Sequence, residues 1–255
     1  MGHVTLSGVR LAIGERTLFE RLDLDVGEGE FLAIVGPNGI GKTTLLRAMA
    51  GFAPIAAGAV RYSGIDLGAL SRTDRAYTVT VIESDAEAPH AMTVGEVVMT
   101  GRYAHRDWWD WLNSDADILG TQMALDEVGL GDLARRQFDT LSSGERQRAW
   151  IALALAQDAT VFLLDEPTSH LDARYALEML GLLRTLAGKS RSIVAVLHDL
   201  NEAAAFADRI AVFGEGKLLT CAPPESALDP DILERAFGVR FKRIAVDGGV
   251  RVLAY

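Results

Sequence analysis

Four short apolar runs stand out along the chain, and each leads directly into polar or glycine-rich sequence. They are Phe31–Val35, Val161–Leu164, Ile193–Leu197 and Ile210–Phe213. Their hydrophobicity is continuous rather than alternating, which indicates strands that are covered on both faces. The runs therefore predict a parallel sheet flanked by helices. In open sheets of this kind ligands bind beyond the carboxyl ends of the strands, so the residues that follow each run are where chemistry is expected.

Other stretches have the periodicity of helices or of half-buried strands. An apolar stripe predicts a helix over Ala173–Ala187 that stops at Gly188, a favoured C-terminal capping residue. Val4–Leu6 and Val60–Tyr62 alternate between apolar and polar residues, which suggests a smaller antiparallel sheet near the start of the chain.

The middle of the chain lacks strand-like runs and is expected to be helical. Four apolar residues recur there at roughly helical spacing: Ile118, Leu119, Met123 and Val128. We therefore expect a single α/β domain in which 1–85 and 159–255 form the core and the antiparallel sheet. Residues 86–158 would form an inserted helical subdomain.

Composition and charge exclude several classes of protein. The 255 residues are 49% hydrophobic and 24% charged, which is typical of a soluble globular protein with a sizeable core. The formal net charge of −10 argues against a nucleic-acid partner and against direct attraction to an anionic membrane. A single cysteine, Cys221, excludes an intrachain disulfide framework and fits a reducing compartment. With no long apolar span and no secretory signal at Met1–Val4, we expect a cytoplasmic protein.

The first apolar run leads into a phosphate-binding sequence. It consists of Gly36, Pro37, Asn38, Gly39, Ile40, Gly41, Lys42, Thr43 and Thr44, and the helix-like Leu45–Ala50 follows. This matches G-x-x-x-x-G-K-[ST] in the strand–loop–helix context that the motif requires. Backbone N–H groups of such a loop and the helix N-terminus attract phosphate. Lys42 is expected to reach the terminal phosphates and the Thr43 hydroxyl to hold Mg²⁺. A glycine-rich turn with a solvated lysine is the ordinary alternative.

Acidic residues follow the second apolar run. Burying Asp165 and Glu166 at a strand end is costly unless a cation compensates them. Asp165 is placed to hold Mg²⁺, directly or through water, together with Thr43, and Glu166 to orient or deprotonate an attacking water. The alternative is a pair of helix-capping acids before Pro167.

A histidine and a second helix start complete the candidate chemistry. His198 follows the third run and is either a structural histidine or a γ-phosphate contact. Ser142 is a plausible N-cap for a helix over Ala149–Gln157, and Gly144 allows close backbone approach. A simple cap would explain this segment, although it also looks suited to phosphate.

Together, Gly36–Thr44, Leu141–Gln147, Leu164–Asp172 and His198 resemble the ATP-binding cassette of ABC transporters, a P-loop NTPase with a RecA-like core. The resemblance covers nearly the whole chain. It implies ATP and Mg²⁺ as cofactors and a head-to-tail pair of cassettes. Glu166 would then be the catalytic base and His198 the γ-phosphate sensor. Ser142 and Gly144 would act across the dimer, Ser143 would bind nucleotide beside them, and Asp172 would lie at the dimer seam.

A finer resemblance is to importers of ferric siderophores, haem and vitamin B12. It is carried by Met92–Val94, Gly101–Tyr103, Glu145–Ala152 and Thr168–Asp172. It implies separate permease subunits, a periplasmic or lipid-anchored substrate-binding protein, and a peripheral location at the cytoplasmic face of the membrane. A soluble or export-type ABC ATPase is the alternative.

Three positions depart from the family's pattern. Where the family has a glutamine that touches Mg²⁺, Glu83 is the likeliest equivalent and Ser84 the second, and a carboxylate there predicts altered Mg²⁺ dependence. Ser143 replaces a glycine: its Cβ narrows the space beside the phosphate, while its hydroxyl offers a donor. The sequence does not decide whether the Cβ or the hydroxyl of Ser143 has the larger effect.

The third departure concerns the nucleotide base. The adenine-stacking aromatic of the family should lie near Ala12 or Ile13, and neither has a ring. Apolar contact or stacking by Arg16 is the expected substitute, with weak discrimination between ATP and GTP. Trp108, Trp109 and Trp111 crowd together in the helical region and form either part of its core or a permease-facing surface.

Overall fold

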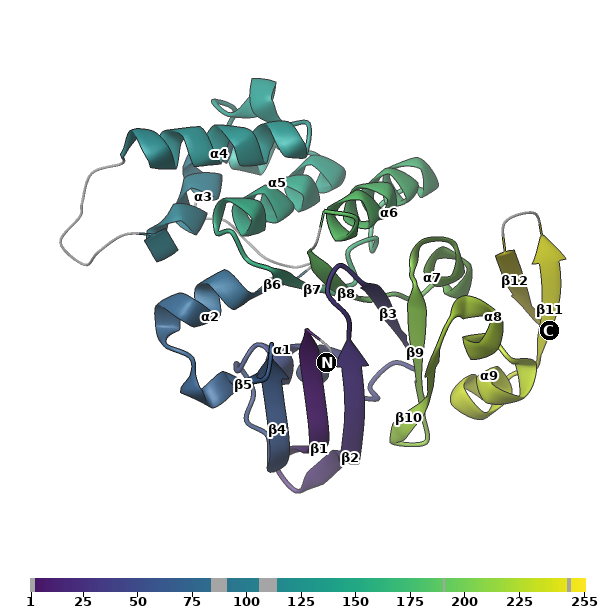
Figure 1. Ribbon diagram of the computed structural model, residues 1–255. Helices are drawn as coiled ribbons and strands as arrows, with labels where there is room; N and C mark the ends of the chain where they lie inside the picture. Colours follow the sequence, from purple (N-terminus) through teal and green to yellow (C-terminus); the bar gives the residue numbers. More distant parts are fainter. Residues whose placement is uncertain (1–2, 84–90, 106–113, 190, 247–248) are drawn as a thin grey trace.

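A six-stranded sheet forms the centre of the molecule in the computed structural model, which describes residues 3–83, 91–105, 114–189, 191–246 and 249–255 (Figure 1). The strand order is β10-β9-β3-β8-β7-β6, and all neighbours are parallel except β9 and β10. The four apolar runs are four of these strands, as predicted. The six strands are β3 (Phe31–Val35), β6 (Val79–Glu83), β7 (Val161–Asp165), β8 (Ser192–Val196), β9 (Arg209–Gly214) and β10 (Lys217–Ala222).

Both faces of this sheet are covered, which explains the continuous hydrophobicity of its strands. Successive side chains of a strand point to opposite faces. Phe31, Ala33 and Val35 accordingly pack in one buried cluster with helices α5 (Ser143–Ala156) and α6 (Ala173–Ala187). Leu32 and Ile34 pack in another with α1 (Lys42–Met49) and the second sheet. Helix α6 has the predicted bounds and ends at Gly188.

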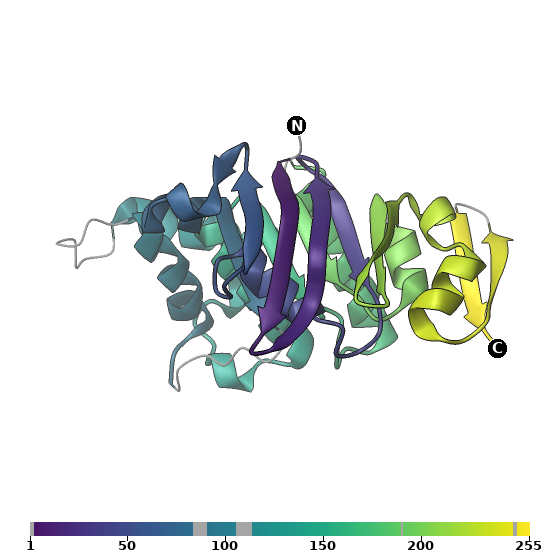
Figure 2. The same ribbon diagram turned by 90° about the horizontal axis from the view of Figure 1, so that it is seen from below.

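The second sheet is antiparallel, as the alternating segments predicted. Its order is β2-β1-β4-β5, with β1 at Val4–Ile13, β2 at Arg16–Val26, β4 at Ala57–Tyr62 and β5 at Ile65–Asp66. Figure 2 shows β1, β2 and β4 as one layer across the middle of the molecule. The turn between β1 and β2 brings Ile13 opposite Arg16, and this end of the hairpin reaches the candidate site described below.

The C-terminal part of the chain packs at the end of the central sheet that is formed by β9 and β10. It contains helices α7 (Leu200–Phe206), α8 (Pro224–Ala227) and α9 (Pro230–Phe237), then a hairpin of β11 (Phe241–Val246) and β12 (Gly249–Ala254). The Asn201 side chain bonds both backbone groups of Val252, accepting from its N–H at 2.8 Å and donating to its carbonyl at 3.2 Å. This clamp fixes the hairpin against α7, which begins just after His198.

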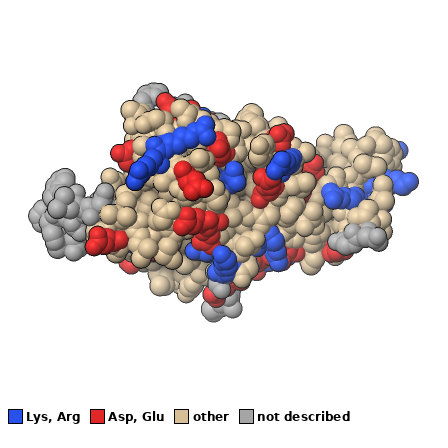
Figure 3. Space-filling view, turned by 90° about the horizontal axis from the view of Figure 1, so that it is seen from above, with Lys and Arg blue, Asp and Glu red and all other residues tan. Residues whose placement is uncertain are grey.

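The surface mixes charges of both signs. On the face shown in Figure 3, Lys and Arg side chains are interspersed with Asp and Glu, in keeping with the net charge of −10. Among the helices that the structure describes, none has the length and apolar character needed to cross a membrane.

Between β6 and β7 the described residues form helices and short 3-10 turns, which gather at one end of the molecule (Figure 1). Val94, Leu125 and Ala152 belong to the same buried cluster as one face of the central sheet, so this region packs directly on the core. The bounds of the inserted helical subdomain, residues 86–158, remain a prediction. The remaining helices are α3 (Val94–Met99) and α4 (Asp115–Glu127) in this region and α2 (Arg72–Thr78) before β6, and the 3-10 turns are Leu67–Ala69, also before β6, Thr100–His105, Gly131–Leu133 and Phe138–Thr140.

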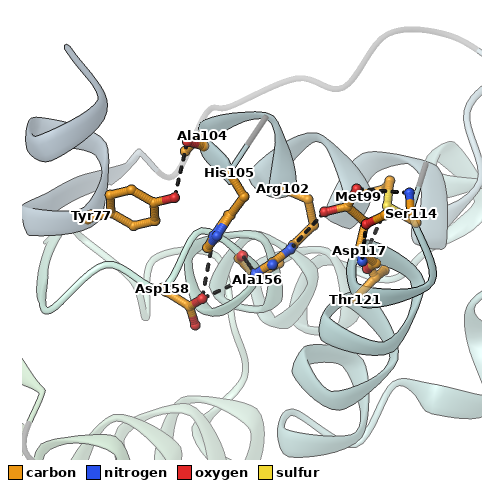
Figure 4. A network of polar contacts seen from close by, with 10 residues as sticks. All are labelled: Tyr77, Met99, Arg102, Ala104, His105, Ser114, Asp117, Thr121, Ala156 and Asp158. Atoms are coloured by element: carbon orange, nitrogen blue, oxygen red, sulfur yellow. Dashed lines mark hydrogen bonds and ion pairs between the residues drawn. The ribbon is translucent and has the colours of Figure 1, made fainter. Parts of the chain in front are cut away.

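Helix α4 exists as predicted, but its buried face mixes polar residues with the apolar Ala124 and Leu125. Asp117 and Thr121 are buried, whereas three of the apolar residues that predicted the helix are exposed: Ile118, Leu119 and Met123. The reason is Arg102, whose Nε pairs with Asp117 Oδ1 at 3.4 Å and whose Nη1 pairs with Asp158 at 3.1 Å (Figure 4). A buried guanidinium needs a carboxylate partner, and α4 turns Asp117 inward to supply it.

Some predicted features lie outside the described residues. These are Ser84, the alternative to Glu83, and the tryptophan cluster of Trp108, Trp109 and Trp111. The core and interface interpretations of those tryptophans both stay predictions.

Candidate nucleotide-binding and hydrolysis site

Four neighbouring parallel strands bring the predicted site residues to one edge of the central sheet. The phosphate loop follows β3, His198 follows β8, and Asp165 ends β7. Glu83 ends β6 and lies opposite Asp165 in the parallel register. Segments far apart in the sequence therefore meet where ligands of open sheets bind.

The phosphate loop encloses a cavity of about 410 Å³. Gly41, which caps α1, has φ of 111°, a left-handed conformation that favours glycine. At Gly36 a Cβ atom would lie 2.7 Å from the carbonyl oxygen of Phe213, so a glycine is needed for the loop to pass β9. The cavity is lined by Ile13, Arg16, Leu18, Asn38, Gly39, Gly41, Lys42, Thr43, Thr44 and Glu166.

Lys42 is the buried cation of this cavity. Its side chain is buried, and its Nζ donates to the carbonyl oxygens of Gly36 at 2.8 Å and Pro37 at 3.0 Å. Burial lowers the pKa of Lys42, while the negative charges of Glu166 and Asp165 oppose that shift. A phosphate oxygen offers this ammonium an acceptor that carries full charge, and charge-assisted hydrogen bonds are stronger than those to carbonyl groups.

Asp165 and Thr43 have the ligand chemistry that Mg²⁺ prefers. Asp165 Oδ1 is buried and has no hydrogen-bond partner among the described residues, whereas the Thr43 hydroxyl bonds the carboxyl group. Burial raises the pKa of Asp165, and the charges of Glu166 and Glu83 raise it further. A buried carboxylate oxygen in need of a partner, next to a hydroxyl and a phosphate loop, fits a magnesium ion shared with phosphate.

Glu166 and His198 are in direct contact. His198 Nε2 lies 2.7 Å from Glu166 Oε1, and Glu166 also lines the cavity. Glu166 has φ of 54°, a left-handed conformation that is uncommon outside glycine and that clusters at functional sites. The helix-capping alternative for the two acids is wrong, since the next helix, α6, begins at Ala173 and is capped by Asp172.

Glu83 is held by a residue that the sequence did not single out. Arg47 Nε lies 2.8 Å from Glu83 Oε1, so this ion pair joins α1 to the end of β6. The only signals for this ion pair in the sequence were an unexpected acid at Glu83 and a basic residue in the helix after the phosphate loop. No local sequence pattern can pair two residues that are this far apart along the chain.

No aromatic side chain is among the described residues that line the cavity. Ile13 and Arg16 line it instead, and Ile13 is 57% exposed. Arg16 Nη2 donates to the Gly39 carbonyl at 3.4 Å, so its guanidinium lies against the phosphate loop.

The second helix start is built as a capping box. The Ser142 hydroxyl accepts from the Glu145 N–H at 3.3 Å and donates to Glu145 Oε2 at 2.8 Å, which confirms Ser142 as the N-cap of α5. Ser143 is the first residue of α5, and a Cβ at Gly144 would lie 3.7 Å from Tyr175. The described lining of the phosphate-loop cavity includes no residue of this segment and not Asp172. Within one chain this helix start therefore does not line the phosphate-loop cavity, and its binding of phosphate stays a prediction.

Comparisons with known proteins agree with this geometry. A sequence profile of the ABC transporter family matches residues 19–169. The chain is 36% identical over 240 residues to the iron(3+)-hydroxamate import ATP-binding protein FhuC of Bacillus subtilis, covering 94% of this chain and 89% of the relative. It is 38% identical over 240 residues to the hemin import ATP-binding protein HmuV of Gloeobacter violaceus, covering 91% and 86%.

Solved structures share the fold. A chain from the inward-facing structure of a transporter provisionally described as of the metal-chelate type superposes with a TM-score of 0.86 at 24% identity, covering 100% of this chain and 97% of that one. The ATP-binding cassette MJ0796, a dimer bound to ADP and Pi, superposes with a TM-score of 0.73 at 24% identity, covering 87% and 98%. Since the family profile spans more than half of the sequence and relatives align over nearly all of it, the chain belongs to the ABC transporter family, as an ATP-hydrolysing cassette.

Proposed function

We propose that this cassette is the ATP-hydrolysing subunit of an importer that takes up a metal chelate, such as a ferric siderophore, haem or cobalamin, through separate permease subunits. The observation that carries the proposal is the convergence of the phosphate loop, Asp165, Glu166 and His198 at one sheet edge, in a chain whose relatives are import ATP-binding proteins. An export cassette has the same chemistry, and no feature of the described site favours it.

In this proposal each residue of the site has a defined role. Lys42 and the N–H groups of the loop bind the phosphates of ATP. Thr43, Asp165 and Glu83 would hold Mg²⁺, which when bound neutralises the charge that develops on the transferred phosphoryl group. Glu166 orients the attacking water and accepts its proton, because its carboxylate lines the cavity. His198 holds that carboxylate through the 2.7 Å contact and senses the terminal phosphate.

The proposed working form is a head-to-tail dimer. Ser142, Ser143 and Gly144 do not reach the cavity of their own chain, so they would complete the site of a second copy. Asp172 would lie at the seam, since it caps α6 next to Tyr175, the residue that packs near Gly144. Closure on ATP and reopening after hydrolysis would drive the permease between its two states.

The proposed location is the cytoplasmic face of the membrane, where the permease subunits hold the cassette and a substrate-binding protein delivers the cargo on the other side. The test is purification of the tagged chain from gently solubilised membranes of its own cell. We expect membrane-spanning subunits to copurify and to raise ATP hydrolysis. Recovery of the chain solely in the soluble fraction, with full hydrolysis and no membrane partner, would favour a soluble ATPase.

A further inference from the structure

The Arg47–Glu83 ion pair lies beside the proposed metal site. Arg47 is on α1, the helix that begins with Lys42, and its Nε lies 2.8 Å from Glu83 Oε1. Glu83 is the register partner of Asp165 on the neighbouring strand. One side chain of the phosphate-loop helix thus contacts a carboxylate next to the buried, unpartnered oxygen of Asp165.

Without Arg47, the carboxylates around Asp165 would leave an excess of negative charge beside the proposed metal site. The negative charges of Glu166 and Glu83 both act on Asp165, and Arg47 opposes them. Lys42, the other nearby cation, is tied to the carbonyl oxygens of the loop. Arg47 and Glu83 are each about half exposed, so solvent weakens their attraction and the pair can open at modest cost.

We propose that Arg47 is a positioning residue that competes with Mg²⁺ for the Glu83 carboxylate, and so sets the Mg²⁺ concentration at which the site binds nucleotide. This inference rests on the proposed function. While Arg47 holds Glu83, the carboxylate adds little net charge to the site. Without Arg47, Glu83 is a free anion beside Asp165, which repels metal-free ATP and attracts the divalent cation.

The test is equilibrium binding of a fluorescent ATP analogue, measured in EDTA and across a range of MgCl₂ concentrations. We expect Arg47→Gln to weaken binding in EDTA and to lower the half-saturating Mg²⁺ concentration by about threefold, a modest change because the pair is solvent-screened. Arg47→Lys keeps the charge and should restore most of the wild-type behaviour. Combined with Glu83→Gln, Arg47→Gln should produce almost no further change, as a double-mutant cycle requires of two coupled residues.

Arg21→Gln is the matched control, because it removes one arginine from an exposed ion pair on β2 that is not part of the site. Thermal unfolding of every variant accompanies the binding curves. An unchanged Mg²⁺ midpoint in Arg47→Gln overturns the inference, as does a shift that persists in the presence of Glu83→Gln. A lowered unfolding temperature without a Glu83-dependent shift would make the pair purely structural. Failure of the wild-type chain to bind the analogue at any Mg²⁺ concentration would instead refute the proposed function.

Discussion

The contact between His198 and Glu166 joins two side chains whose tasks depend on each other. Glu166→Gln keeps the shape but removes the proton acceptor, so we expect hydrolysis to fall by about a hundredfold or more while ATP binding is retained. His198→Ala leaves the carboxylate without its 2.7 Å partner and should also slow hydrolysis. Steady-state phosphate release and binding of a fluorescent ATP analogue measure the two effects separately.

Residues that act as a unit are not additive. The double variant Glu166→Gln/His198→Ala should therefore hydrolyse ATP no more slowly than Glu166→Gln alone. If the two losses instead multiply, His198 acts mainly through the terminal phosphate, and holding the Glu166 carboxylate is not its main role.

The lining of the cavity by Ile13 and Arg16, with no ring beside them, predicts tolerance of different bases. We expect ATP and GTP to bind wild type with similar affinity, because the lining offers no aromatic ring. Ile13→Tyr should tighten both nucleotides by about tenfold, since stacking on a ring contributes about 1–3 kcal/mol for any base. Competition of unlabelled ATP and GTP against a fluorescent analogue measures this. A strong wild-type preference for ATP would contradict the assignment.

At the scale of elements, the sequence predicted what is periodic and local. The four apolar strands, helix α6 and the phosphate loop were all predictable because each has its signal within a single stretch. Strand β6 was not among the predicted strands: it lies at the edge of the sheet, where only Val79 and Ile82 are buried. Helix α4 was predicted, but the burial of Asp117 was not, because its partner Arg102 comes from another segment.

The same distinction applies to the site. The motif residues could be found by their spacing, and the strand order then brought them together as expected. The contacts of Glu166 with His198 and of Glu83 with Arg47 are tertiary, and no sequence pattern records them. Sequence alone therefore predicted which groups react, but not which of them hold one another.

The start of α5 has both a folding role and a proposed chemical role. Helix α3, which has only the folding role, serves as the control that distinguishes them. Thr93 and Glu96 form a capping box at α3 like that of Ser142 and Glu145 at α5. Ser142→Ala and Thr93→Ala should each cost about 1 kcal/mol of stability, measured by urea unfolding. Only Ser142→Ala should also slow hydrolysis. Equal losses of hydrolysis in the two variants would reduce Ser142 to a helix cap.

These capping boxes also predict a dependence of stability on pH. Hydrogen bonds from the backbone and hydroxyl groups of Ser142 and Thr93 lower the pKa of Glu145 and Glu96 respectively. Because the folded pKa lies below the ordinary value, the stabilisation is complete above the ordinary carboxyl pKa and is lost as pH falls through the lowered one. The penalty of Ser142→Ala should therefore shrink in acid. A penalty that is independent of pH would mean that the hydrogen bond from the Ser142 hydroxyl to the Glu145 carboxylate adds nothing to the cap.

At the scale of the whole molecule, the separation of the two anion-binding elements is the strongest argument for a second copy. The phosphate loop is fixed to the central sheet through α1, and Ser142 is fixed to the helical region through α5, so neither can reach the other without breaking its own cap and core contacts. Each copy also carries a net charge of −10, so two copies repel one another. Association should therefore require bound nucleotide.

Mixing two inactive variants tests this arrangement directly. Lys42→Ala disables the phosphate loop and Ser142→Ala disables the opposing helix start, so a homodimer of either variant has a defect in both sites. In a head-to-tail heterodimer one site combines two intact halves while the other carries both defects. We expect an equimolar mixture to hydrolyse ATP faster than the mean of the two separate variants, and Glu166→Gln with ATP and Mg²⁺ to sediment as a dimer. A mixture that gives only the mean rate, together with a Glu166→Gln variant that stays monomeric even beside its permease, would mean that each chain completes its site alone.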